Sequence, residues 1–237
     1  MIPLRDDVPS RRLPLMMVVL ITANILAFFA EIRQPPPRQE AMFYRYGLVP
    51  ATYWPMDRPQ PHRPALWTYV KPFFTHMFLH AGWLHLLSNM WFLWIFGFSV
   101  EDRMGHLGFL IFYLICGLAA AVTQLYFSRQ SAVPMVGASG AIAGVLGAYL
   151  LLYPLARITV LVPILIYPLF IRVPALLFIV GWFALQLYSG YESYWKSGPA
   201  EGVAWWAHVG GFAAGLLLCP CLAQRRVVPR PVRPRTI

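Results

Sequence analysis

Ser139 and His208 are the two side chains of this sequence whose types and surroundings suit nucleophilic chemistry. Ser139 belongs to the string GASG (137–140), which opens an apolar run, and His208 belongs to the string WWAHVGGFAAG (205–215). A serine hydroxyl becomes a nucleophile when a neighbouring imidazole takes its proton, so this pair would hydrolyse an acyl bond. Each residue also has a structural interpretation, because small residues pack membrane helices and a buried histidine can serve packing alone. The elements that carry the two residues decide between these interpretations.

The composition predicts an integral membrane protein. Of the 237 residues, 59% are hydrophobic and 12% are charged, with a mean hydropathy of +0.58, well away from the averages of soluble domains. The net charge of +10 would also suit a nucleic-acid-binding protein, but its densest cluster is a C-terminal tail of five arginines that directly follows an apolar run. There the tail can face anionic lipid. We therefore expect membrane lipids, and not nucleic acid, as partners.

Six apolar runs are candidates for transmembrane helices, each of which needs about 20 residues. They cover residues 14–30, 83–100, 107–127, 139–153, 173–189 and 203–223. The predicted fold class is therefore all-α, a polytopic bundle of six transmembrane helices. A further apolar stretch, Ile158 to Ile171, is short and holds Pro163 and Pro168, so we expect it to be a loop at the membrane interface.

The distribution of Lys and Arg predicts which side of the membrane the termini occupy. With six spans the two termini share one side, and that side carries eleven of the nineteen basic residues. Both termini are thus expected in the cytoplasm, and the long loop after the first span outside, in a multi-pass protein of the cell (inner) membrane. The expected division is a cytoplasmic N-terminal segment 1–13, a membrane-embedded domain 14–223 and a basic cytoplasmic tail 224–237.

The fourth run is too short to cross the bilayer from surface to surface. From Ser139 to Tyr153 it has 15 residues, or about 22 Å of helix against about 30 Å of hydrocarbon. We therefore expect its N-terminus below the outer surface, beside a cavity that water reaches, because irregular backbone cannot face lipid. The unpaired amides at the start of this helix would point at the site, where a tetrahedral oxyanion needs donors.

Small residues give the fourth and sixth runs faces that can approach closely. In the sixth run His208 shares a face with Gly211 and Gly215. The fourth run and the turn before it carry a second set of small residues, Gly137, Gly140, Ala143, Gly144 and Gly147. Packing the two faces together would bring Ser139 within reach of His208 on the outer side. All nine acidic residues lie outside the six runs, so we predict a Ser-His dyad without a carboxylate.

Another group of polar residues lies in and before the second run, with the spacing His76-x3-His80-x4-His85-x3-Asn89. Three histidines could be metal ligands, but the sequence has no HExxH and no carboxylate nearby, so we expect no metal site. His85 and Asn89 lie one helical turn apart on one face, and we interpret them as side-chain donors to an oxyanion. His76 and His80 are expected to make structural hydrogen bonds at the interface.

These motifs together resemble those of the rhomboid family of intramembrane serine proteases, in its minimal six-helix, bacterial-type form. The matching strings are HxxxN (85–89), GxSG (137–140) and AHxxGxxxG (207–215), and the resemblance covers roughly residues 66 to 219. It implies Ser139 as nucleophile, His208 as general base and acid, and an oxyanion hole formed by His85, Asn89 and the Ser139 backbone amide. It also implies cleavage of membrane-anchored proteins in or near a transmembrane helix, with no metal, ATP or other cofactor.

The sequence also departs from some rhomboid relatives. An aromatic residue that often follows the serine by four positions, and stacks on the histidine, is Ala143 here, which leaves open what orients His208. The Trp-Arg pair sometimes seen in the first loop is not matched around Lys71-Pro72. The ExR pair at Glu101 and Arg103 fits the family, although from the residues alone it is expected to anchor a loop.

Two other classes of function are alternatives. One is a catalytically inactive rhomboid-like protein that binds membrane proteins in quality control, which retention of both reacting residues argues against. The other is a transporter or channel, which should show intramembrane charges or repeated broken helices. The sequence does not indicate the oligomeric state, the physiological substrate or the element that gates access.

Overall fold

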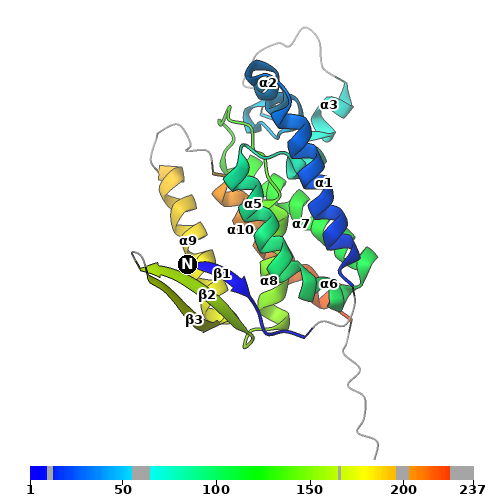
Figure 1. Ribbon diagram of the computed structural model, residues 1–237. Helices are drawn as coiled ribbons and strands as arrows, with labels where there is room; N and C mark the ends of the chain where they lie inside the picture. Colours follow the sequence, from blue (N-terminus) through cyan, green and yellow to red (C-terminus); the bar gives the residue numbers. More distant parts are fainter. Residues whose placement is uncertain (10–12, 55–64, 165–166, 196–202, 225–237) are drawn as a thin grey trace, which may run out of the picture.

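The computed structural model describes residues 1–9, 13–54, 65–164, 167–195 and 203–224 (Figure 1). Within these ranges the chain is mostly helical, and the predicted class of a polytopic helical membrane bundle is confirmed. The predicted basic tail 224–237 lies outside the described residues except for Gln224. So do several of the charged residues counted for topology: Arg11, Arg12, Arg58, Arg63 and Lys196.

Four helical segments of the described chain are long and apolar enough to cross a membrane. They are α1 (Leu15–Ile32), the segment Trp83–Met104, α7 (His106–Phe127) and α10 (Trp205–Leu222). The second is continuous but composite, with α5 (Trp83–Phe92), the π-helical turn η3 (Leu93–Gly97) and α6 (Phe98–Met104). Two further apolar helices, α8 (Ser139–Leu152) and α9 (Ala175–Trp195), complete the bundle. Their role as the fourth and fifth spans stays a prediction.

The segment between α1 and α5 is built from short helices. These are α2 (Pro36–Tyr46), η1 (Pro50–Thr52), α3 (Leu66–Val70), α4 (Pro72–Thr75) and η2 (His76–Phe78). Backbone hydrogen bonds join this segment to the stretch that precedes α8. Leu48 and Met135 bond to each other, the amide of Ala51 donates to the carbonyl of Ser131 at 2.9 Å, and the amide of Gly137 donates to the carbonyl of His76 at 2.8 Å. The segment therefore holds the approach to Ser139 in place.

The stretch predicted to be a loop, Ile158 to Ile171, is a β-hairpin, so that prediction was wrong. Strands β2 (Arg157–Ile164) and β3 (Tyr167–Pro174) pair antiparallel, and β1 (Ile2–Arg5) adds to the other side of β2. The prolines are tolerated because Pro163 lies opposite Pro168, beyond the residues of β2 that pair with β1. There, among the described residues, β2 pairs with β3 alone. The sheet lies below α9, at the same end of the bundle as the N-terminus (Figure 1).

The N-terminal segment is also attached to the bundle, which the sequence did not indicate. The Asp6 carboxylate accepts hydrogen bonds from the Tyr149 hydroxyl at 2.6 Å and the Ser99 hydroxyl at 3.2 Å. The indole N–H of Trp91 donates to the carbonyl of Pro3 at 2.6 Å. Burial raises the pKa of the Asp6 carboxyl above its ordinary value, against these two hydroxyl donors.

Helix α8 lies in the centre of the bundle, and its small residues set how closely the neighbours pack. Every residue from Gly140 to Tyr149 is buried. A Cβ atom on Gly215 would lie 2.7 Å from the Cα of Gly144, and one on Gly211 would lie 2.9 Å from the carbonyl carbon of Gly140. Helices α8 and α10 therefore touch backbone to backbone, as small-residue faces allow in membranes.

Candidate active site

Ser139 is the first residue of α8, and the turn before it needs a glycine. Gly137 has a φ of 119°, a conformation that side chains with a Cβ rarely adopt. A Cβ there would also lie 2.6 Å from Nε2 of His85, so the imidazole rests against this turn. Because Ser139 opens the helix, its backbone N–H has no acceptor within α8 and is free to face a ligand.

The side chains of Ser139 and His208 meet across the α8–α10 contact. Nε2 of His208 lies 2.8 Å from Oγ of Ser139, although the residues are 69 positions apart in the chain. His208 is 9% exposed, and Ser139 is half-buried. The backbone contact of Gly211 with Gly140 lies one turn from His208 and next to Ser139, so the glycines bring the two side chains within hydrogen-bond distance.

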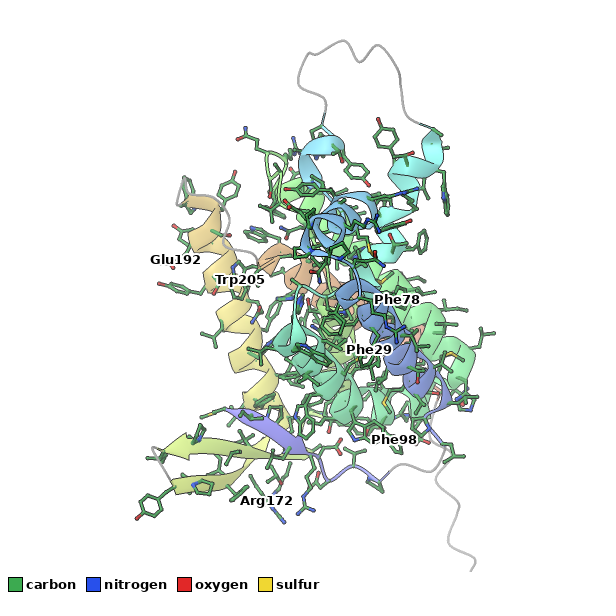
Figure 2. All side chains as sticks on the ribbon, turned by 45° about the horizontal axis from the view of Figure 1, so that its top comes forward. Phe29, Phe78, Phe98, Arg172, Glu192 and Trp205 are labelled. Atoms are coloured by element: carbon green, nitrogen blue, oxygen red, sulfur yellow. The ribbon has the colours of Figure 1, made fainter. Side chains whose placement is uncertain are left out.

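The other nitrogen of the His208 ring bonds to a residue that sequence reasoning missed. Nδ1 of His208 lies 2.7 Å from Oε1 of Gln186, which comes from α9 and is 6% exposed. Two indole rings, Trp182 and Trp205, lie 5.9 and 6.2 Å from the imidazole between ring centroids. Figure 2 shows Trp205 at the start of α10, on the side that faces α9. The signal that could have drawn attention to Gln186 is an amide within an otherwise apolar run.

His85 and Asn89 lie together on α5, as their spacing predicts. Nδ2 of Asn89 donates to the carbonyl of His85 at 2.7 Å, which uses one of its two amide hydrogens, and Asn89 is 6% exposed. Among the described residues neither side chain bonds to Ser139 directly. The contact of His85 with Gly137 places its imidazole beside the turn that leads into Ser139.

His76 and His80 lie in the segment just before α5. Nδ1 of His76 is 2.8 Å from the carbonyl of Pro72, while the ring of His80 lies 5.0 Å from that of His85. Burial lowers the pKa of both His76 and His80 to about 4, so both are neutral at physiological pH. In the part of the chain that the structure describes, no three His, Cys, Asp or Glu side chains are grouped as a metal site would require.

One acidic residue is more deeply placed than the sequence suggested. Glu31 was placed outside the first apolar run, but α1 continues to Ile32 and the side chain of Glu31 is 0% exposed. One of its carboxylate oxygens accepts from the backbone N–H of His80 at 3.2 Å. The hydrogen bond of Glu31 is thus to the backbone of His80. The side chain that contacts Nδ1 of His208 is that of Gln186.

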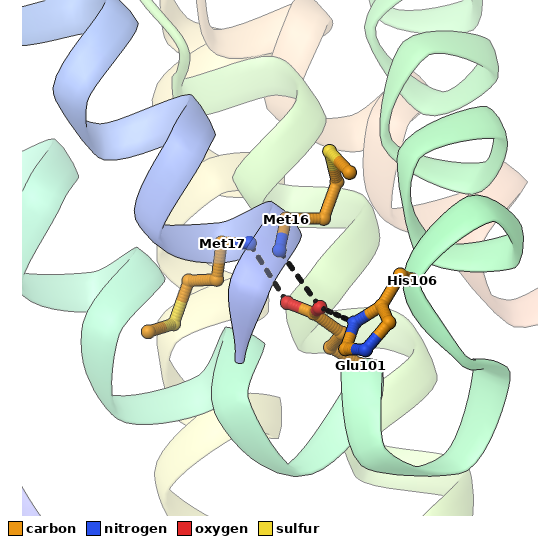
Figure 3. Close-up of polar contacts among 4 residues, drawn as sticks. All are labelled: Met16, Met17, Glu101 and His106. Carbon is orange, nitrogen blue, oxygen red and sulfur yellow. Dashed lines mark hydrogen bonds and ion pairs between the residues drawn. The ribbon is translucent and has the colours of Figure 1, made fainter. Parts of the chain in front are cut away.

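Glu101 and Arg103 lie at the far end of the second span from His85, and their contacts are those of an anchor. The Glu101 carboxylate accepts from the backbone N–H groups of Met16 and Met17 at 2.9 and 2.7 Å, and it lies 2.6 Å from Nδ1 of His106 (Figure 3). It thus caps the N-terminus of α1 from another helix. The Arg103 guanidinium donates to the carbonyl of Gln224 just after α10.

Comparison with known proteins identifies relatives along most of the chain. A family model described as "Rhomboid domain" matches residues 64–225. RHOMBOID-like protein 1 of Arabidopsis thaliana is 32% identical over 157 residues, which are 66% of this chain and 34% of that protein. Rhomboid protease GluP of Bacillus subtilis is 42% identical over 76 residues, 32% of this chain and 14% of that protein.

A third relative, the chloroplastic Rhomboid-like protein 11 of Arabidopsis thaliana, is 44% identical over 72 residues, 30% of this chain and 25% of that protein. The matched segments therefore span about a third or less of the length of these relatives. The match to the family model, residues 64–225, includes both Ser139 and His208.

Proposed function

Because this chain belongs to the rhomboid family, we propose that it is an intramembrane serine endopeptidase whose nucleophile is Ser139 and whose general base is His208. The observation that carries the proposal is the 2.8 Å contact between Oγ of Ser139 and Nε2 of His208. One relative, from Bacillus subtilis, is named a rhomboid protease. A nucleophile in hydrogen-bond contact with a base, itself oriented by a third group, is the arrangement that covalent acyl transfer needs.

In the first half of the reaction Ser139 Oγ attacks the carbonyl carbon of the scissile peptide bond. Its proton passes to Nε2 of His208, and the carbonyl π electrons move to oxygen, giving a tetrahedral oxyanion. As the oxyanion collapses, the C–N bond breaks and His208 gives the proton to the leaving amine. The product is an ester of Ser139 with the N-terminal fragment.

In the second half water attacks the ester carbonyl while His208 takes a proton from that water. The second oxyanion collapses with loss of Ser139 Oγ, which recovers the proton from His208. The fragment leaves as a carboxylic acid, and the enzyme returns to its starting state. Every proton movement is handled by the dyad, so the reaction as proposed uses no metal, ATP or other cofactor.

The oxyanion would be stabilised by donors at the start of α8 and from α5. The Ser139 backbone N–H has no acceptor in its own helix, and the positive end of the helix dipole points the same way. His85 packs against Gly137, and Asn89 retains a second amide hydrogen beyond the one given to His85. Removal of one donor of this kind typically lowers kcat by about 10²- to 10³-fold.

The short α8 accounts for how water would reach a site within a membrane. Its 14 residues span about 21 Å, less than the hydrocarbon thickness of about 30 Å. If the C-terminal end of α8 lies at the cytoplasmic surface, Ser139 at its N-terminal end would lie below the outer surface. The site would then open to the outer side of the membrane. The substrates are then membrane-anchored proteins cut in or near their transmembrane segments, in the cell membrane, with both termini of the enzyme in the cytoplasm.

The proposal is tested with purified protein in liposomes and a single-span reporter. Wild-type protein should cleave the reporter and react with a fluorophosphonate probe, whereas Ser139→Ala should do neither and His208→Ala should lose cleavage. Gly181→Ala is the matched control, because a Cβ at this position of α9 would meet nothing within 4 Å. Unchanged cleavage by Ser139→Ala would refute the mechanism. A folded wild-type protein that binds the reporter but never cleaves or labels would instead support an inactive, client-binding relative.

A further inference from the structure

Gln186 stands where serine hydrolases commonly have a carboxylate, on the side of the histidine away from the nucleophile. Its Oε1 lies 2.7 Å from Nδ1 of His208, and it comes from α9, a helix that contributes neither reacting group. With 6% exposure it is also one of the few polar side chains buried in the described bundle. An amide in this place can orient the imidazole without bringing a charge into the membrane, where a carboxylate is costly.

The orientation of the Gln186 amide follows from its second hydrogen bond. Nε2 of Gln186 donates to the carbonyl of Trp182, one turn earlier in α9, at 3.2 Å. The reversed amide would set its oxygen against that carbonyl oxygen, and neither atom has a hydrogen to share. Oε1 must therefore face Nδ1 of His208, and because a carbonyl oxygen can only accept, Nδ1 must carry the hydrogen.

The tautomer of His208 follows in turn. A neutral imidazole has one N–H, so a hydrogen on Nδ1 leaves Nε2 with a lone pair. Nε2 is the nitrogen 2.8 Å from Oγ of Ser139, and it can then accept the hydroxyl proton. The opposite tautomer would point an N–H at Ser139 and leave Nδ1 facing Oε1 with two lone pairs opposed. The amide of Gln186 thus selects the form of His208 that works as a base.

The packing of α9 on α10 fixes this contact in space. The rings of Phe183 and Phe212 stack with centroids 4.2 Å apart, and Trp182 contacts both Phe212 and His208. Gln186 lies one turn beyond Phe183 on the same side of α9. The helix therefore presents the amide to His208 from a packed surface, in place of the aromatic residue that Ala143 does not supply.

From these contacts we infer that Gln186 is a positioning residue of the catalytic site, which holds His208 in the Nδ1-protonated tautomer and forms with the dyad a Ser-His-Gln triad. The inference rests on the proposed protease function. It differs from a purely structural role, in which Gln186 satisfies a buried polar atom and its loss changes stability alone.

Three substitutions separate the two roles when reporter cleavage and thermal unfolding are measured together. Gln186→Leu keeps the size but removes the acceptor, so kcat should fall about 10- to 100-fold with KM unchanged. Gln186→Glu keeps an acceptor and should restore kcat to within about 10-fold of wild type. Gln124→Leu is the comparator: this buried amide accepts from the backbone N–H of Ala207 next to His208, so its loss should lower stability without changing the pH profile.

The pH–rate profile adds a readout that a structural role would not change. A carboxylate at position 186 favours the imidazolium, so the acid limb of Gln186→Glu should move to higher pH than that of wild type. The side chains around His208 are Ser139 from α8, Trp182 from α9, Trp205 from α10 and, at longer range, the titratable His85 from α5. All of these are the same in the variants, so the difference reports position 186.

The tautomer of His208 can be determined by solid-state ¹⁵N NMR of histidine-labelled protein in bilayers. Because this measurement uses the wild-type protein, it tests the inference even if Gln186→Leu does not fold. Wild-type His208 should show a protonated Nδ1 and an unprotonated Nε2. Protonation at Nε2 in the wild type, or wild-type kcat in a folded Gln186→Leu, would overturn the inference. If either result is obtained and Ser139→Ala is inactive, the inference about Gln186 fails but the protease proposal stands. If Ser139→Ala still cleaves the reporter, the protease proposal itself fails.

Discussion

Replacing Gly215 with alanine tests whether the backbone contact of α8 with α10 holds Ser139 and His208 together. Gly215 lies two turns after His208 on the same face of α10, and it touches no reacting atom. An added Cβ would lie 2.7 Å from the Cα of Gly144, and the carbonyl oxygen of Gly144 is closer still. Those neighbours are backbone atoms in the centre of a buried helix, so no side chain can turn aside to make room.

The size of the effect follows from these distances. Two carbon atoms need about 3.5 Å, so α10 must withdraw from α8 by about 0.8 Å at this point, and by more to clear the oxygen. If the helix moves as a rigid body, the 2.8 Å contact of His208 with Ser139 lengthens past 3.5 Å, beyond hydrogen-bond range. A misplacement of about 1 Å in a catalytic pair lowers the rate about 10²-fold, so kcat should fall by about that factor.

The assay is cleavage of a single-span reporter in liposomes by Gly215→Ala and by its control, Gly181→Ala. Glycine to alanine within a helix is otherwise favourable by about 1 kcal/mol, so the control should be at least as stable as wild type and fully active. Thermal unfolding is measured in parallel to show that Gly215→Ala remains folded. Wild-type kcat in a folded Gly215→Ala would refute the argument that glycine contacts set the Ser139–His208 distance.

Two further predictions concern the anchors of the bundle. Glu101→Ala removes the acceptor of two backbone N–H groups of α1. An uncapped helix end and a buried unpaired donor each cost about 1–2 kcal/mol, so the free energy of unfolding should fall by about 2–4 kcal/mol. Glu101→Gln should lose less, since it keeps one acceptor oxygen; equal stability of wild type and Glu101→Ala in a denaturant titration would contradict the capping role. For Asp6, burial raises the pKa of the folded carboxyl above 3.8, so the folded state binds this proton more tightly than the unfolded state. Attachment of β1 should therefore weaken as pH rises from about 3.8 through the raised pKa. The protection of the β1 amides against exchange, taken relative to the intrinsic exchange rate at each pH, should fall over that window in wild type but not in Asp6→Asn; the same pH dependence of protection in both proteins would show that another group is responsible.

Much of the bundle follows from the sequence because long apolar runs and their interruptions are local features. The second span shows both the value and the limit of such reasoning. Its apolar run was predicted to end near residue 100, whereas the helix continues to Met104 and includes the turn that carries Glu101. That residue was expected to be an anchor, but which helix it would cap was not indicated, because the amides of Met16 and Met17 are about 85 positions away.

The sequence did not predict the β2–β3 hairpin, because two prolines argue against strands there and because the sheet includes β1, which is distant in the sequence. Ile158 and Val160 are buried and alternate with less buried residues, as a half-buried strand requires. Pro163 and Pro168 argued against a strand. They are accommodated because they face each other at a place where β2, within the described part of the chain, pairs with β3 alone. The pairing of β1 with β2 joins residues some 155 positions apart, which no local pattern reveals.

The candidate site, too, was determined in part by the sequence and in part by the tertiary structure. The sequence by itself determined that a serine opens a short apolar helix and that a histidine shares a face with glycines, because helical periodicity converts spacing into faces. Only the tertiary structure decided that Gln186 of α9 meets the second nitrogen of His208, that Glu31 is buried against the backbone of His80, and that Asn89 gives one amide hydrogen to His85. The physical reason is that a side chain's chemistry is set by the atoms it contacts, and in a helical bundle those atoms belong to other helices.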